Sequence, residues 1–267
     1  MAHGVGSRGV TIILGVLLSV LAWAGEARPS AVRVQQPPDV AALLARIDDL
    51  YRSKSSIARI DLLVTSPRTT RSLRMRAWSR GEDEALVIIE APPREEGIAT
   101  LRVGQNLWNY LPRIARTIRV PPSMMLGSWM GTDFTNDDLV KESSLRKDFT
   151  SRLGSRSTSP VGWWIVLDVK PGVVGRWSKI ELLVSDELLP VEERHFDRRN
   201  RLARTMTFDE IKTLGGRRLP THLTLVPTDV QGQRTEMRYL ELQFDIALPD
   251  DTFSLARLER GKIGNHQ

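Results

Sequence analysis

The sequence predicts a mainly β protein, in which one or two helices accompany a meandering antiparallel sheet of about ten or eleven strands. From residue 57 onward, apolar residues alternate with polar residues, which is typical of strands that bury one face. Short segments rich in Gly, Pro, Asn and Asp separate these runs, as the turns of hairpins do. By contrast, residues 39–54 show the spacing of an amphipathic helix.

The first 24 residues have the features of a secretory signal peptide. Residues 1–9 carry one basic residue and no acid, and residues 10–24 form an apolar run. This run is short for a membrane helix, which needs about 20 apolar residues. Ala22-Trp23-Ala24 gives the small-x-small pattern of a cleavage site. We therefore expect an exported protein that begins near Gly25, with a retained membrane anchor as the alternative.

The remainder predicts a tether followed by one domain. Residues 25–38 contain several Pro and Gln residues and predict a flexible tether. Residues 39–260 contain neither an internal repeat nor a linker that divides them, so we expect a single domain.

Composition excludes several classes of function. The chain has no Cys, which removes disulfides, thiol nucleophiles, Cys-ligated zinc and the acylated cysteine of a lipoprotein. Its formal charge is +6, but the basic residues lack the aromatic neighbours typical of single-strand binders, so we expect no nucleic-acid partner. A solvated sheet face explains the charge, and attraction to anionic lipid head groups is the alternative.

The elements follow in order from the N-terminus. Asp39 can cap a helix through about Lys54, and the apolar stripe of this helix comprises Val40, Leu43, Leu44, Ile47, Leu50 and Tyr51. Segments of strand type lie at residues 57–66, 71–80, 85–90, 97–103, 107–111, 114–120, 162–169, 177–184, 188–197, 202–214, 219–227 and 234–245. Residues 140–159 are polar and irregular, and a short helix is expected at about 144–152.

A Met-rich loop lies at the centre of the chain. Residues 124–134 contain Met124, Met125, Leu126, Trp129, Met130 and Phe134, with Gly127 and Gly131 on either side of the Trp. Soft Met side chains and flexible Gly residues suit a movable lid that repacks around apolar ligands. The alternative is a buried loop that plugs the end of the sheet. Residues 135–139 have the pattern of a capped helical turn.

The expected ligand surface is one face of the sheet. Alternation places Leu73 and Met75 on one face of their strand, and we expect their neighbours there to be Val87, Ile89, Leu101, Trp108 and Tyr110. An unbroken strand over residues 114–120 would place Arg116 between two Ile residues on the apolar face, where it would bind a head group or latch the lid. A bulge that turns Arg116 to solvent is the alternative.

No catalytic or cofactor site is evident. Outside the signal peptide and the last two residues, the histidines are His195 and His222, and neither has a His or Cys at metal-ligand spacing. The acidic residues Asp133, Asp137, Asp138 and Glu142 are better explained by a helix N-terminus than by a calcium loop. We therefore expect no metal, no cofactor and no enzymatic activity.

The central block resembles that of the periplasmic LolA-like proteins, the outer-membrane lipoprotein-sorting family. In that family a W-x-Y-x-P strand is followed by a basic strand and by an S-W-M-G-[ST]-D-F-[ST]-x-[ED]-D-L segment. The matching residues are Trp108, Tyr110, Pro112, Ser128, Trp129, Met130, Gly131, Asp133, Phe134, Asp138 and Leu139. A looser similarity extends over nearly all of the mature chain, including residues 189–202 and 250–261.

The resemblance implies an unclosed antiparallel β-barrel with a concave apolar cavity and a helical lid. It also implies a periplasmic carrier that moves lipid or lipoprotein acyl chains towards the outer membrane through transient membrane contact, in several cases beside an inner-membrane transporter. The chain departs considerably from the better-known lipoprotein carriers, so the cargo does not follow from the resemblance. The alternative function is a sensor or adaptor that binds a partner protein in the same cup, and a hydrolase is a third.

Overall fold

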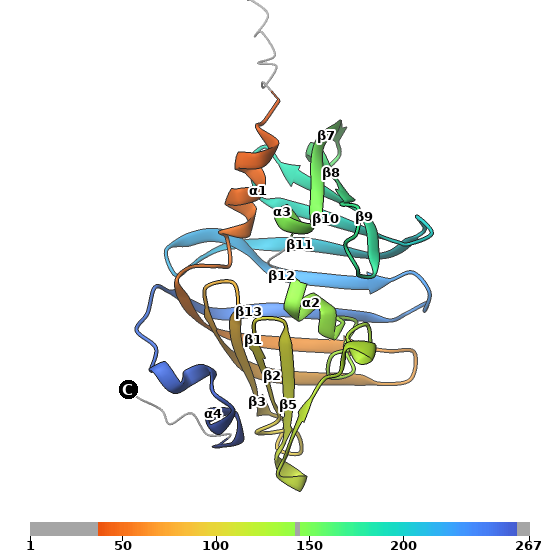
Figure 1. The fold of residues 1–267 in the computed structure, drawn as a ribbon. Coiled ribbons are helices and arrows are strands. Elements are labelled where there is room, and N and C mark those ends of the chain that lie inside the picture. The colour runs from red at the N-terminus through yellow and green to blue at the C-terminus, as the bar shows by residue number, and fades with distance from the viewer. Residues whose placement is uncertain (1–36, 142–144, 261–267) are drawn as a thin grey trace, which may run out of the picture. The chain divides into compact units, whose positions relative to one another are not determined.

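The computed structural model describes residues 37–141 and 145–260, so the expected signal peptide and most of the tether lie outside the described residues. Within this part, an antiparallel sheet of 13 strands has the order β6-β5-β4-β3-β2-β1-β13-β12-β11-β10-β9-β8-β7 (Figure 1). The chain builds β1 to β6 as one meander, crosses to the far edge, and returns from β7 to β13, which pairs with β1. The sheet is unclosed, because β6 and β7 form its two edges.

The first meander comprises β1 (Ser55–Thr65), β2 (Thr70–Arg80), β3 (Glu84–Ala91), β4 (Ala99–Val103), β5 (Asn106–Leu111) and β6 (Arg116–Arg119). The second comprises β7 (Phe149–Thr158), β8 (Val161–Val169), β9 (Trp177–Ser185), β10 (Pro190–Asp197), β11 (Leu202–Leu214), β12 (Arg217–Pro227) and β13 (Arg234–Phe244). The helices are α1 (Val40–Asp48), α2 (Asn136–Lys141), α3 (Leu145–Asp148) and α4 (Leu255–Arg260), with 3-10 turns η1 (Pro112–Ile114), η2 (Pro122–Met124) and η3 (Asp250–Phe253).

Helix α1 begins where the sequence predicts and ends earlier. The Asp39 carboxylate accepts hydrogen bonds from the backbone N–H groups of Ala41 and Ala42, at 2.9 and 3.3 Å. The predicted apolar stripe is confirmed: Leu43, Leu44 and Ile47 pack in a buried cluster with side chains of β7, β8 and β9. Helix α1 therefore covers this half of the sheet.

The polar region after α2 differs most from the expectation. Residues 149–158 form the edge strand β7, and the predicted helix at 144–152 is reduced to the four residues of α3. Most β7 side chains are exposed, so this strand has no alternation of buried apolar residues to reveal it. A predicted strand at 114–120 is also shorter, because η1 and the left-handed Ala115 (φ 48°) precede β6.

The two faces of the β1–β5 half of the sheet carry separate apolar clusters. Met75 and Trp129 belong to a cluster on the face that the Met-rich loop covers. Phe253 and Leu258, from η3 and α4, pack with Trp78 in a cluster on the other face. This double cover explains why strands in the first meander contain large apolar residues on both faces.

None of the helices in the described ranges has the length and apolar character that a membrane crossing requires.

Candidate ligand-binding cavity

A cavity of about 350 Å³ lies between the sheet and the segments that cover it. Its apolar lining includes Ala58, Ile60, Met75, Ala77, Val87, Trp129, Phe134, Phe149, Trp177, Leu223, Met237 and Leu242. These side chains come from both meanders and from the Met-rich loop, and Ile47 of α1 also lines the cavity. The volume is at the lower end of the roughly 300–1,000 Å³ typical of small-molecule pockets.

Helix α2 closes one side of the cavity and is fixed at its N-terminus. The Thr135 N–H donates to Asp138 Oδ2 at 2.7 Å, and the Asp138 N–H donates to Thr135 Oγ1 at 3.1 Å. This reciprocal pair is a capping box, so the predicted capped turn is confirmed. Buried Arg102 donates to the Leu139 carbonyl at 3.1 Å and joins α2 to β4.

The Met-rich loop divides into an anchored part and an exposed part. Trp129 is 2% exposed, and its indole N–H donates to Thr100 Oγ1 at 3.0 Å. Met124 and Leu126 are 60% and 52% exposed. Met124 and Leu126 therefore face solvent in this conformation, whereas Trp129 is packed as firmly as a core residue.

The expected hinge glycines lie on either side of this anchor. Gly131 has a φ of +72°, a conformation that favours glycine, and follows Met130, whose φ is 49°. The Met130 carbonyl accepts a hydrogen bond from Arg71 at 2.6 Å. Gly127 donates its N–H to the Met124 carbonyl at 3.0 Å. Movement about these residues remains a prediction.

Several predicted ligand residues reach the cavity or its supporting core. Met75, Val87, Trp129 and Phe134 line the cavity directly. Leu73, Ile89 and Met130 pack in the adjoining cluster. Met125 packs instead with Leu107 and Val120.

Leu101, Trp108 and Tyr110 lie on the other face, so their expected position beside Leu73 and Met75 is wrong. All three belong to the cluster that includes Phe253 and Leu258. In this register Leu101 lies opposite Trp108, and the residue before each, Thr100 and Leu107, lines the cavity. Because successive side chains of a strand point to opposite faces, an error of one residue in the alternation assigns every side chain to the wrong face.

A polar cluster in one wall of the cavity was missed by the sequence reasoning. It comprises Asp138 of α2, Trp177 of β9, Glu193 and His195 of β10, and Arg204 of β11. Arg204 binds Asp138 through two hydrogen bonds, from Nη1 to Oδ2 at 2.7 Å and from Nη2 to Oδ1 at 2.8 Å. His195 Nε2 lies 3.0 Å from Glu193 Oε2. Four separate elements supply these residues, so no local pattern indicates the cluster.

Burial and charge set the protonation states in this wall. Burial alone would raise the pKa of Asp138, but the charge and hydrogen bonds of Arg204 outweigh it and lower the pKa. Burial lowers the pKa of His195, and Arg204 lowers it further, while Glu193 and Asp138 act in the opposite direction. At neutral pH the wall therefore holds an ionised Asp138 and a neutral His195.

This protonation state predicts that stability decreases in mild acid. The pKa of His195 is lower in the folded protein than the value of about 6.5 in an unfolded chain, so below that pH the unfolded state binds more protons. The contribution of His195 is fully present above pH 6.5 and diminishes as the pH falls. Urea denaturation should show that the free energy of unfolding of the wild type falls between pH 7.5 and pH 5.5. This decrease should be smaller in His195→Phe and unchanged in His222→Phe. Equal pH dependence in all three proteins would contradict this assignment.

Arg116 lies outside the cavity. It is exposed on edge strand β6, because η1 and Ala115 interrupt the strand that the sequence predicted. The premise of an apolar strand face around Arg116 is therefore wrong, since Ile114 and Ile118 are also exposed.

Replacing Arg116 by leucine should change little. Surface substitutions of this kind usually alter the free energy of unfolding by at most about 0.5 kcal/mol. We expect the thermal midpoint and the affinity for apolar probes to match those of the wild type. A clear loss of probe affinity would restore a role for Arg116 as a head-group ligand.

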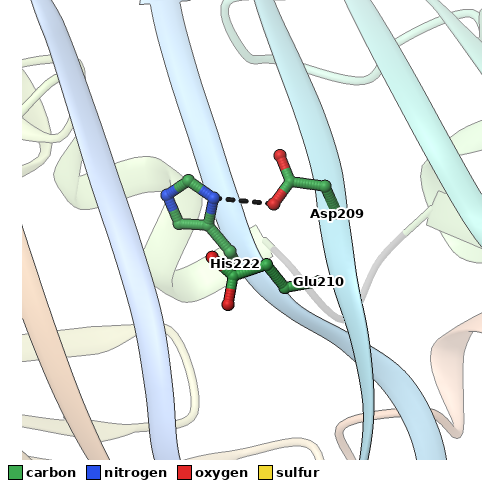
Figure 2. Close-up of side chains that lie close together, drawn as sticks. All are labelled: Asp209, Glu210 and His222. Carbon is green, nitrogen blue, oxygen red and sulfur yellow. Dashed lines mark hydrogen bonds and ion pairs between the residues drawn. The ribbon is translucent and has the colours of Figure 1, made fainter.

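A second group of polar side chains, Asp209, Glu210 and His222, has the composition of a metal site. Figure 2 shows the contact between His222 Nδ1 and Asp209 Oδ1, which measures 2.7 Å. Hydrogen bonds from Arg238 and Lys212 lower the pKa of Glu210 to about 2. Arg238 and Lys212 already neutralise the charge of the Glu210 carboxylate, so ion pairs explain why these side chains lie together.

Comparisons with known proteins bear on the family and the fold. A family model described as "-like: Uncharacterized protein" matches residues 81–260, which are 180 of the 267 residues. No curated protein matches the sequence significantly. Each of the three solved structures described next is 19% identical to this chain.

A DUF1329 family protein from Desulfovibrio piger has a TM-score of 0.73, over 81% of this chain and 96% of its own. A domain assigned as an outer membrane lipoprotein-sorting protein, from Vibrio parahaemolyticus, has a TM-score of 0.68, over 82% of this chain and 97% of its own. A LolA superfamily protein from Nitrosomonas europaea has a TM-score of 0.68, over 82% of this chain and 98% of its own. At this identity the structures establish the fold, and the predicted unclosed antiparallel architecture is confirmed. The chain belongs to the family that the matching model describes, and its fold is the one seen in the LolA superfamily and lipoprotein-sorting structures.

Proposed function

We propose that this protein is a periplasmic carrier that shields an acyl chain in the cavity and moves it towards the outer membrane. The observation that carries the proposal is the cavity itself, which is lined mainly by apolar side chains and covered by short helices and the Met-rich loop. Burial of one methylene group contributes about 0.8 kcal/mol. A partly buried chain therefore binds with useful affinity and still dissociates.

The fold and the sequence support the compartment. The LolA superfamily and lipoprotein-sorting proteins share this architecture. Residues 1–24 have the pattern of a secretory signal peptide, which agrees with export. A non-enzymatic carrier also agrees with the absence of any catalytic pattern in the sequence.

Residues 113–126 offer a surface for transient membrane contact. This segment exposes the apolar side chains of Ile114, Ile118, Met124 and Leu126 and the charged side chains of Arg113, Arg116 and Arg119. Exposed apolar groups beside basic groups favour an anionic lipid surface. Delivery of a chain to a membrane requires such contact, whether or not an inner-membrane transporter takes part.

Native mass spectrometry of the protein purified from its own periplasm tests the proposal. We expect a mass increase equal to one lipid or one acylated polypeptide, which is lost after denaturation and refolding in lipid-free buffer. Purification without a bound lipid, together with a stoichiometric partner polypeptide, would contradict the carrier function and favour the sensor or adaptor alternative.

A further inference from the structure

The polar wall of the cavity contains two buried atoms without hydrogen-bond partners. His195 is 5% exposed and Arg204 is 6% exposed. His195 Nδ1 and Arg204 Nε have no partner among the described residues, although both side chains line the cavity. An unsatisfied buried polar group costs about as much as a lost hydrogen bond, so the pair is a ready site for a polar ligand group.

The two side chains are neighbours in the sheet. His195 and Arg204 are direct partners in the antiparallel pairing of β10 and β11. Trp177 contacts both, with its ring centroid 5.0 Å from that of His195 and 4.4 Å from Arg204 Cζ. Both side chains therefore lie against the indole of Trp177 at one place in the wall.

The chemistry of each atom follows from its other contacts. A carboxylate accepts hydrogen bonds only, so the neutral His195 ring carries its proton on Nε2, which donates to Glu193. Nδ1 is then an acceptor. Arg204 uses Nη1 and Nη2 for Asp138, which leaves Nε–H as a donor. A ligand that satisfies both must accept one hydrogen bond and donate another.

The charge in this wall disfavours an anion. Asp138 and Glu193 each carry one negative charge, Arg204 carries one positive charge, and His195 is neutral, which leaves a net charge of −1. Two further arginines line the cavity outside this group: Arg176 is partly exposed and lies against Trp177, with Cζ 4.9 Å from the ring centroid, and Arg198 is exposed and donates to the Gly175 and Val173 carbonyls. The partly buried carboxylates of Asp138 and Glu193 both act on His195, so they would repel a carboxylate or phosphate at this place and favour an uncharged group.

We propose that this wall binds an uncharged hydroxyl group, and that the ligand is a single-chain lipid with a hydroxylated head, such as a fatty alcohol or a monoacylglycerol. One hydroxyl oxygen accepts from Arg204 Nε–H and donates its proton to His195 Nδ1 in a hydrogen bond, while the acyl chain occupies the apolar part of the cavity. This assignment rests on the proposed function, because it assumes that the cavity takes an acyl chain.

The test compares three twelve-carbon ligands in displacement of the neutral fluorophore N-phenyl-1-naphthylamine from the full-length mature protein. They are dodecan-1-ol, its methyl ether 1-methoxydodecane, and dodecanoate. The ether accepts a hydrogen bond but cannot donate one, so it leaves His195 Nδ1 unsatisfied. We expect dodecanol to bind about tenfold more tightly than the ether, and dodecanoate to bind more weakly than dodecanol.

His195→Phe removes the acceptor and keeps an aromatic ring against Trp177. In this variant the alcohol and the ether should bind within twofold of each other, whereas the matched control His222→Phe should keep the tenfold preference. The wild type provides a second readout that needs no substitution: the ¹⁵N chemical shift of His195 Nδ1 should move when dodecanol binds and stay when the ether binds.

Two results would overturn the inference and leave the carrier function intact. These are equal affinities for the three ligands in the wild type, or tighter binding of dodecanoate, which would assign the head-group site to an anion. Failure of all three ligands to displace the fluorophore would instead contradict the proposed function.

Discussion

Replacing Trp129 by alanine should lower the free energy of unfolding by about 3–5 kcal/mol, the range for a buried aromatic residue. Trp129 is 2% exposed, packs with Leu73, Met75 and Ile89, and donates a hydrogen bond to Thr100. The movable lid expected from the sequence would instead predict a small loss of stability, because a mobile lid contributes less than the core. The observed packing reverses that expectation. Urea denaturation followed by circular dichroism measures the change.

Two controls separate the anchor from the rest of the loop. Met124→Ala, in the same loop but 60% exposed, should change stability by at most about 0.5 kcal/mol. Trp129→Phe keeps the ring and loses the hydrogen bond to Thr100, which predicts a loss of about 1 kcal/mol. A loss below about 1 kcal/mol for Trp129→Ala, with probe binding abolished, would show that the tryptophan belongs to a lid rather than to the core.

Replacing Asp138 by alanine should destabilise the protein by about 3–5 kcal/mol, because it leaves the Arg204 guanidinium buried without its partner. The substitution also removes the capping box at the start of α2. The surface variant Glu187→Ala breaks an exposed pair with Arg218 and should cost at most about 1 kcal/mol. Chemical denaturation of the two variants gives the comparison.

The double variant Asp138→Leu/Arg204→Met tests the origin of this loss. An apolar pair of similar volume avoids an unpaired buried charge, so it should recover more than half of the stability lost in Asp138→Ala. If the double variant is as unstable as the single variant, the loss comes from the helix cap rather than from the buried guanidinium.

The sequence predicted the elements that bury one face and missed those that do not. Alternation identified β2, where Leu73 and Met75 are buried and Arg74 is exposed. Edge strand β7 exposes most of its side chains, so its sequence lacks the alternation that a buried face produces. For this reason the sequence predicted an irregular segment there. The break before β6 depends on Ala115 in a left-handed conformation, which its residue type does not indicate.

The candidate site was only partly predictable for a related reason. Met75, Val87, Trp129 and Phe134 were identified because apolar residues in alternating strands and in a loop indicate a covered face. Trp108 and Tyr110 were misplaced because both faces of β4 and β5 are apolar, and periodicity alone cannot choose between them. The polar wall depends on the pairing of His195 with Arg204 across strands and on the approach of α2, which only the tertiary fold determines.

The most direct test of the central claim is a titration of a cavity-filling variant with an acyl ligand. Ala77 lines the cavity from β2, and Ser72 is an exposed position on the same strand. Ala77→Trp should weaken the binding of 1-methoxydodecane by at least about tenfold, which corresponds to the exclusion of about two methylene groups. Ser72→Trp should bind as the wild type does, and both variants should keep the wild-type circular dichroism spectrum. Unchanged affinity in a folded Ala77→Trp protein would show that acyl chains do not bind in this cavity.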